Sequence, residues 1–199
     1  SPDMLANHYL YRALYPDTVY RNESGGVPEA IPELSQEEFV AFHERYYHPS
    51  NSYIFLSGDM AIEKILNSIQ ARFLNQFNYQ KIDATVPAQK PVKKMQMIEK
   101  EYSVGEKEET KERTYFCVGF TIGESGDQET LLGMQSLNAI LVGFPASPLK
   151  SALVDAKLVK EFSGSLDDSI RFPNLIFTGA GAETKEKKRF KETFFKTLE

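Results

Sequence analysis

The stretch NLIFTGAGA, residues 174–182, follows directly on another strand-like stretch, KEFSGSLDD at residues 160–168, and this succession decides the fold. Two earlier strands are predicted, one by the polar–apolar alternation of KKMQMIEKEYSV (residues 93–104) and one by the apolar TYFCVGFTI (residues 114–122). Because strands follow strands without an intervening helix, we expect an α+β fold made of sandwich domains, with largely antiparallel sheets and helices on one face.

Helices around these strands are indicated by the residues at which they start. Asp127 is a predicted N-cap for a helix from Gln128 to Val142. Ser147-Pro148 begins a shorter helix that runs to about Leu158, with proline at the first helical position. A last helix is predicted from Lys185.

The chain divides at a polar, proline-containing segment. We expect residues 1–80 to be the C-terminal part of one domain, residues 81–92 to be a linker with Pro87 and Pro91, and residues 93–199 to be a second α+β domain. Whether this second domain is complete at its C-terminus stays open. The highly charged GEKEETKE (residues 105–112) is predicted to be a solvated hairpin or loop.

The first half has strong local signals but little sheet. A helix is predicted from Asp3, as N-cap, to Tyr15, and a long loop rich in proline and glycine follows. Ser35 and Glu38 then form a capping box for a second helix that ends before Pro49.

The remainder of the first half is predicted to be one strand and one helix. NSYIFLS at residues 51–57 is β-branched and aromatic enough for a buried strand. Gly58-Asp59 turns the chain, with Asp59 as N-cap, and an apolar stripe predicts a helix over residues 62–73. One strand cannot cover these helices, so we expect an incomplete domain whose opening strands are missing.

Composition limits the classes of function. The chain has 199 residues, 41% of them hydrophobic, and a net charge of −5, which argues against a general nucleic-acid binder. No apolar stretch approaches the ~20 residues that a membrane span needs, so we expect no membrane partner and, by default, a cytoplasmic location. The chain opens at Ser1-Pro2 without Met and closes in a helical run, and we interpret it as an internal fragment.

The stretch FHERYYHPSN, residues 42–51, suggests a zinc motif but has the wrong spacing. Zincins place two histidines four residues apart on a helix, whereas His43 and His48 are five apart. Five helical residues turn the side chains about 140° apart instead of about 40°. Pro49 also drives His48 out of the helix. With His8 the only other histidine, the sequence predicts no zinc site within this chain.

Other candidate chemistry has a simpler structural explanation. Cys117 lies in the apolar run TYFCVGF and is interpreted as a core residue, not a nucleophile. TGAGAET follows a strand, but it lacks the third glycine of a dinucleotide loop and places Glu183 where a pyrophosphate would bind. The pairs Glu37-Glu38 and Asp167-Asp168 are interpreted as a capping turn and a solvated loop. No catalytic or metal-binding residue is therefore assigned.

Residues 20–59 nevertheless carry an ordered series of short motifs, which are Ser24-Gly25-Gly26, Ile31-Pro32, Phe42-His43, Tyr46-Tyr47-His48-Pro49-Ser50-Asn51 and Gly58-Asp59. This series resembles the pitrilysin/insulinase family of inverted-motif zinc peptidases, in its presequence-protease-like branch. A looser likeness continues through ASPLKSALVDAKL (residues 146–158) and NLIFTGAGA.

This resemblance implies a metallopeptidase-like parent that degrades unfolded peptides in a closed chamber. The family binds zinc on an inverted H-x-x-E-H helix with a further Glu ligand, and the motif Glu activates zinc-bound water. Both elements precede this region in the family, so the resemblance implies zinc in the full-length parent and none in this chain, which should be inactive. The implied partners are peptide substrates and the remainder of the same polypeptide, while the substrate-binding residues are unknown.

A second reading keeps the fold but removes the chemistry. The same fold also serves as a non-catalytic scaffold or interaction subunit, and such a parent would lack H-x-x-E-H. The sequence upstream of this chain would distinguish the two hypotheses.

Overall fold

The structure is a computed structural model that describes residues 2–199. The chain divides into two compact units, one made of Ser1–Glu23 with Pro87–Glu199 and one made of Ser24–Val86. In chain order, the helices and strands are α1 (Pro2–Leu14), α2 (Gln36–Tyr46), α3 (Ile62–Arg72), β1 (Thr114–Thr121), α4 (Gln128–Val142), α5 (Pro148–Asp155), β2 (Glu161–Asp167), β3 (Asn174–Ala182) and α6 (Lys187–Leu198).

The first unit is built on a three-stranded antiparallel sheet in the order β1-β3-β2. Val118 of β1 and Gly164 of β2 both pair with Phe177 of β3, which therefore runs through the centre of the sheet. This antiparallel sheet with helices confirms the expected α+β class.

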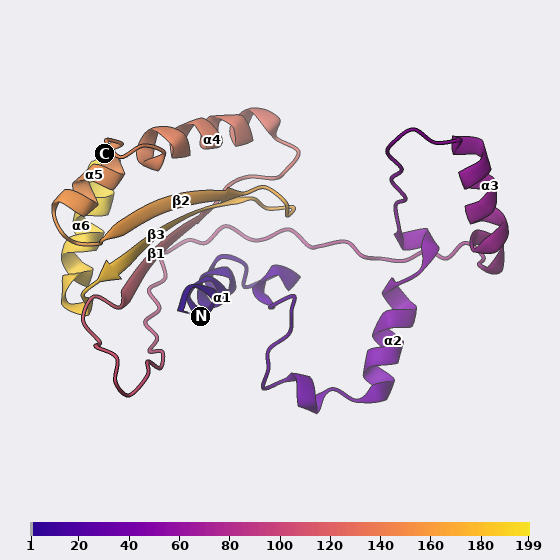
Figure 1. Ribbon diagram of the computed structural model, residues 1–199, viewed down its shortest axis with the longest axis horizontal. Helices are drawn as coiled ribbons and strands as arrows, with labels where there is room; N and C mark the ends of the chain where they lie inside the picture. The colour runs from indigo at the N-terminus through magenta and orange to yellow at the C-terminus, as the bar shows by residue number, and fades with distance from the viewer. Residues whose placement is uncertain (1) are drawn as a thin grey trace. The chain divides into compact units, whose positions relative to one another are not determined.

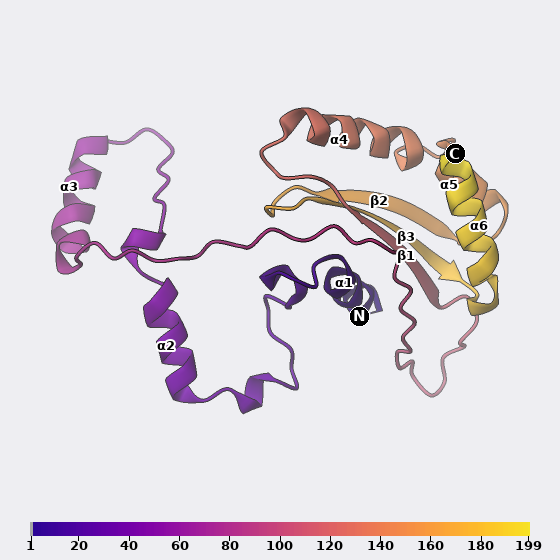
Figure 2. The same ribbon diagram turned by 180° about the vertical axis from the view of Figure 1, so that it is seen from behind.

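Helices cover both faces of this sheet. Figures 1 and 2 show α4, α5 and α6 over one face and α1 on the other. A Cβ on Gly119 of β1 would lie 2.9 Å from Leu14 of α1, whereas a Cβ on Gly164 of β2 would lie 2.3 Å from Asn138 of α4. The expectation that helices lie on one face only is therefore wrong for α1, which comes from the part of the chain assigned to the other domain.

The core of this unit is aromatic. Phe194 of α6 is fully buried, with its ring centroid 5.5 Å from that of Phe177 and 6.3 Å from that of Phe162. Leu149 and Leu153 of α5 are also fully buried in the same cluster. Phe177 of the central strand β3 and the apolar stripe of α6 thus meet in one layer.

Local signals placed most helices correctly. The Ser35–Glu38 capping box is present at the start of α2, and the Asp127 side chain accepts a hydrogen bond from the Thr130 amide at the start of α4. Helix α5 ends three residues before Leu158, because Lys157 has a left-handed φ of 56°, which stops the helix.

Two expected N-caps are wrong. Asp3 lies inside the first turn of α1, where its charge favours the helix N-terminus, and does not precede the helix. The N-cap position of α3 is occupied by Ala61 instead of Asp59. Gly58 does turn the chain, with a φ of 126°.

Two expected strands are not formed. In the first expected strand, Asn51 ends the short 3₁₀ helix Pro49–Asn51, and residues 52–57 follow it without pairing to another strand. Residues 93–104 run alongside α6 without a ladder of backbone hydrogen bonds. A strand is stable only when a neighbour satisfies its backbone groups, and neither segment has such a neighbour among residues 2–199. The sheet therefore has three strands instead of the four predicted for the second half.

The compact units also differ in extent from the expected domains. Ser1–Glu23 belongs with Pro87–Glu199, so the first unit draws on both sides of the predicted linker at residues 81–92. Domain ranges of 1–80 and 93–199 remain predictions about the whole protein. No helix among residues 2–199 has the length and apolarity needed to cross a membrane.

Candidate functional site

The two histidines of FHERYYHPSN lie at the end of α2 and make local contacts. The exposed His43 ring stacks on the Tyr47 ring, with centroids 4.6 Å apart. His48 lies beyond the helix, as predicted, and its Nδ1 accepts a hydrogen bond from the Ser50 amide at 3.1 Å. His48 thereby caps the 3₁₀ helix Pro49–Asn51 and fixes the corner of the chain.

No metal-binding geometry accompanies these residues. His8 lies in α1, in the other compact unit, with its ring edge-on to Tyr9. Across residues 2–199, no three His, Cys, Asp or Glu side chains are grouped so as to hold a metal ion.

Cys117 sits in β1 in an environment that keeps the thiol protonated. Its Sγ lies 3.8 Å from the Thr178 hydroxyl of β3. Burial raises the pKa of the Cys117 thiol, and the contact with Thr178 offsets this only in part. The thiolate is the reactive form of cysteine, and burial disfavours it. We therefore interpret Cys117 as a half-buried residue of the sheet and not as an activated nucleophile.

The glycines of TGAGAET are explained by packing within the sheet. A Cβ at Gly179 would lie 2.6 Å from a Val159 methyl, and Gly181 has a φ of 71° with Lys160 against it. Glu183 accepts a hydrogen bond from the Glu112 amide at 3.1 Å. Close packing within the chain therefore explains the glycines of this turn without a phosphate-binding role.

The most extensive buried polar group joins α1 to the sheet. We call it the tyrosine network, and it consists of Tyr11, Tyr15, Asp167 and Asn174. Tyr11 donates to Asp167 at 2.7 Å, and the Asn174 side-chain amide donates to the Tyr15 and Tyr11 hydroxyls at 3.0 and 3.3 Å. Tyr15 donates in turn to the Phe172 carbonyl at 2.6 Å.

Electrostatics favour a structural role for the tyrosine network. Burial raises the pKa of both Tyr11 and Tyr15, so both phenols remain neutral donors. Burial also acts to raise the pKa of Asp167, but hydrogen bonds from Ser169 and Tyr11 outweigh it and hold that pKa below its usual value. A neutral phenol paired with a carboxylate that already accepts several hydrogen bonds has no free base or nucleophile to offer.

Sequence analysis missed this network. Tyr11 lies in the last turn of α1 and Tyr15 follows the helix directly, four residues later, which is a recognisable signal. Their partners, however, lie more than 150 residues away. The interpretation of Asp167-Asp168 as a solvated loop holds for the exposed Asp168 and is wrong for Asp167.

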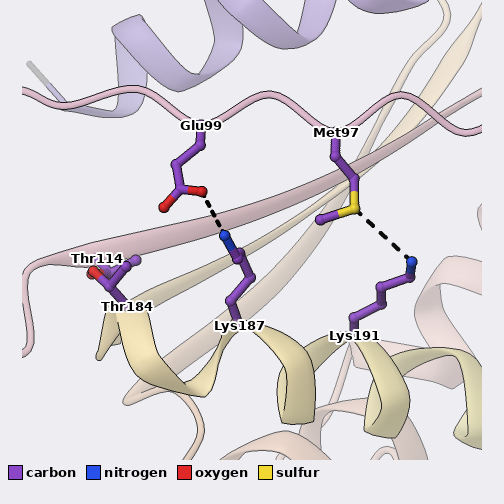
Figure 3. A network of polar contacts seen from close by, with 6 residues as sticks. All are labelled: Met97, Glu99, Thr114, Thr184, Lys187 and Lys191. Atoms are coloured by element: carbon purple, nitrogen blue, oxygen red, sulfur yellow. Dashed lines mark hydrogen bonds and ion pairs between the residues drawn. The ribbon is translucent and has the colours of Figure 1, made fainter.

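A second set of polar contacts attaches the segment before β1 to α6. Figure 3 shows Glu99 and Met97 pointing from this segment toward α6, where Glu99 pairs with Lys187 and the Met97 sulfur lies 3.9 Å from the Lys191 ammonium. On the opposite side, Lys100 lies 5.0 Å from the Tyr9 ring of α1. Successive side chains thus alternate in direction, as in a strand, although no ladder forms.

Two clefts of the first unit are open to solvent. One of about 380 Å³ lies between the loop after α1 and residues 89–96, where the Gln89 side chain and Asp17 exchange hydrogen bonds of 3.1 and 3.0 Å. Another of about 500 Å³ is lined by Met95, Lys191, Glu192 and Phe195. Neither combines a nucleophile with a base, so neither forms a catalytic constellation.

The second unit, Ser24–Val86, has no buried side chain at all. Its helices expose large apolar residues, among them Phe39 and Phe42 of α2 and Ile62 and Leu66 of α3. An amphipathic helix normally buries its apolar face, so this unit presents a surface suited to packing.

Comparison with known proteins identifies relatives of the whole chain. A family model described as "Peptidase M16 inactive domain" matches residues 33–199. "Protein HypA" of Clostridium perfringens is 38% identical over 198 residues, which is 100% of this chain and 20% of that protein. "Presequence protease 1, chloroplastic/mitochondrial" of Arabidopsis thaliana is 31% identical over 205 residues, covering 99% of this chain and 18% of that protein. The chain thus spans about a fifth of the curated relatives it matches.

Solved structures show the same fold. A putative M16-like peptidase from Alicyclobacillus acidocaldarius aligns with a TM-score of 0.64 at 21% identity, over 99% of this chain and 46% of that chain. A protease from Helicobacter pylori aligns with a TM-score of 0.57 at 16% identity, over 96% of this chain and 50% of that chain.

Proposed function

This chain belongs to the M16 peptidase family, by its match to the M16 inactive domain, and we propose that it is an internal part of a larger zinc-dependent endopeptidase. The observation that carries the proposal is the match of the whole chain to about a fifth of each of the two relatives described above, one of which is named a presequence protease. Within such a parent, zinc would polarise the scissile carbonyl and activate water from residues outside this chain.

The role of this chain is structural and not chemical. His43 and His48 make ring-stacking and capping contacts, and the Cys117 thiol is held protonated by burial. These observations support the prediction that the chain alone binds no catalytic zinc and cleaves no peptide. The α+β unit made of Ser1–Glu23 with Pro87–Glu199 would contribute one wall of a chamber in which the parent degrades unfolded peptides.

The test compares the 199-residue chain with its full-length parent. Metal analysis by mass spectrometry should find about one zinc per full-length molecule and none per isolated chain, and only the parent should cleave an unfolded fluorogenic peptide. One tightly held zinc per isolated chain, or peptide cleavage by it, would overturn the structural role.

The alternative is that the parent is a non-catalytic scaffold. The family model that matches this chain is described as an inactive domain, which is compatible with such a parent. The full-length protein discriminates between the two, because a scaffold would hold no zinc and cleave no peptide. We retain peptide substrates and the remainder of the polypeptide as the proposed partners, and no nucleic acid, in view of the net charge of −5.

Cellular location is not fixed by these comparisons. A cytoplasmic location stays a prediction, whereas the names of several presequence-protease relatives place those proteins in mitochondria or chloroplasts.

A further inference from the structure

Helix α4 is apolar on the side that faces away from the sheet as well as on the side that packs on it. Leu132, Ile140 and Phe144 are 65%, 63% and 67% exposed. With two small residues between them they form the outer face of α4, which consists of Leu132, Gly133, Ser136, Ile140 and, just beyond the helix, Phe144. We propose that the outer face of α4 is a permanent interface, covered by the part of the same polypeptide that lies outside this chain.

The geometry of the helix separates this face from the core. Leu141 and Val142 are buried in the aromatic core of the unit. Leu132, Ser136 and Ile140 recur every four residues, which places them on one side of a helix, and all three are exposed. Leu132 and Leu141 are about two and a half turns apart and therefore point to opposite sides. A helix that is apolar on two opposite sides is typical of a helix that is buried on both.

The sequence around α4 lacks the charges of a solvent-facing helix. From Thr130 to Leu149 no residue is charged, although 26% of the chain is. Helix α6, in the same layer (Figure 1), has the usual pattern, since its exposed residues include Lys188 and Glu192. Depletion of charge is the compositional mark of the core of an interface. The outer face of α4 therefore fits a partner that excludes water from it.

Gly133 gives independent support for close contact at this face. Glycine in the middle of a helix is destabilising relative to alanine. A Cβ on Gly133 would meet no atom of the described residues within 4 Å, apart from the backbone of its own helix, so packing within this chain does not require glycine there. A partner backbone that approaches α4 closely would require it.

The rest of the same polypeptide is the partner that the observations favour. Transient interfaces are about as polar as the rest of a protein surface, whereas permanent ones are more apolar. A helix that lies on a membrane surface carries Lys or Arg, and Gln128–Val142 contains neither. The relatives have about four fifths of their length outside the matched region, which is enough chain to cover α4. The inference rests on the proposed function only in requiring a longer parent chain.

Hydroxyl-radical footprinting with mass spectrometry tests the interface in the unmodified sequence. Leu132, Ile140 and Phe144 should be oxidised at least about fivefold less in the full-length parent than in the isolated 199-residue chain, because the core of an interface excludes water. Phe194, which is fully buried in the core of the unit, should be protected in both samples. Equal oxidation of the outer face of α4 in the two samples would overturn the proposal.

The same measurement separates this partner from the others. Protection in the isolated chain that grows with its concentration would reject the proposal in favour of a second copy of the chain. Protection of the parent that appears only when an unfolded peptide is added would reject it in favour of a substrate. Protection in a parent without zinc or peptidase activity would reject the proposed function but keep the interface.

Gly133→Leu provides a second measurement, with opposite expectations in the two proteins. In the isolated chain it should raise the Tm by about 2–3 °C, because leucine is the better helix former. In the parent it should lower the Tm by several degrees, because the added side chain would collide with the covering segment. Gln135→Leu is the matched control, since it adds the same side chain at an exposed position of α4 outside this face, and it should change either Tm by less than about 1 °C. A rise for Gly133→Leu in both proteins would contradict the interface, as would an equal fall for the two variants in the parent.

Discussion

Removing the hydroxyl of Tyr15 tests how firmly α1 is attached to the sheet. This hydroxyl is fully buried, donates to the Phe172 carbonyl at 2.6 Å and accepts from the Asn174 amide at 3.0 Å. Asn174 keeps its bond to Tyr11 in Tyr15→Phe, but the Phe172 carbonyl loses its hydrogen bond. A buried acceptor left unpaired costs about 1–3 kcal/mol, so the free energy of unfolding should fall by about 2 kcal/mol. For a chain of this size the Tm should fall by roughly 4–8 °C.

The assay is urea unfolding followed by far-UV circular dichroism, since the chain contains no tryptophan to serve as a probe. Tyr9→Phe is the matched control, because Tyr9 lies in α1, the helix that Tyr15 directly follows, and contacts Lys100 through its ring, which phenylalanine retains. The control should stay within about 0.5 kcal/mol of the wild type. If Tyr15→Phe also stays within that range, the reasoning fails and α1 is not held on the sheet by this network in solution.

Three other changes probe the first unit by the same urea assay. The pKa of Asp167 is lower in the folded state than its unfolded value of about 3.9, so the carboxylate stabilises the fold above that pH. This contribution is lost as the pH falls through the folded-state pKa. Asp167→Asn should therefore be destabilising at about pH 7 and approach the stability of the wild type near pH 2. Phe194→Ala should cost about 3–5 kcal/mol, whereas Phe144→Ala, at a ring that is 67% exposed, should cost less than about 1 kcal/mol. Gly179→Ala should lower the free energy of unfolding by about 1–3 kcal/mol, because the alanine Cβ would lie 2.6 Å from Val159. Gly133→Ala, in open space on α4, should raise it by about 0.5–1 kcal/mol. If Gly133→Ala were the more destabilising of the two, the packing argument would be contradicted.

Elements defined by neighbouring residues could be predicted from the sequence. The capping box of α2 needs only Ser35 and Glu38, which are three residues apart, and α4 begins directly after its cap at Asp127. Strand β3 matches NLIFTGAGA over the whole of residues 174–182. In each case the signal and the structure it specifies lie within one turn or one strand, so no distant contact has to be known.

Features that depend on distant partners could not be predicted in this way. NSYIFLS has strand composition, yet forming a strand requires a neighbour that residues 2–199 do not provide. The attachment of α1 to the sheet depends on Asp167 and Asn174, which are far along the chain from Tyr11 and Tyr15. The expectation that no catalytic or metal residue lies in this chain stays a prediction, to be tested by the metal analysis proposed above.

The two units differ in how far they can stand alone, and this bears on where family resemblance is concentrated. Pro87–Glu199 builds the aromatic core around Phe177 and Phe194, which needs nothing beyond the unit itself. Ser24–Val86 contains most of the residues that resemble the peptidase family, yet it buries none of its side chains. Residues fixed by a core of their own would be expected to be buried within the unit. A motif-rich stretch without a core is instead explained if its apolar side chains pack against other parts of the parent polypeptide.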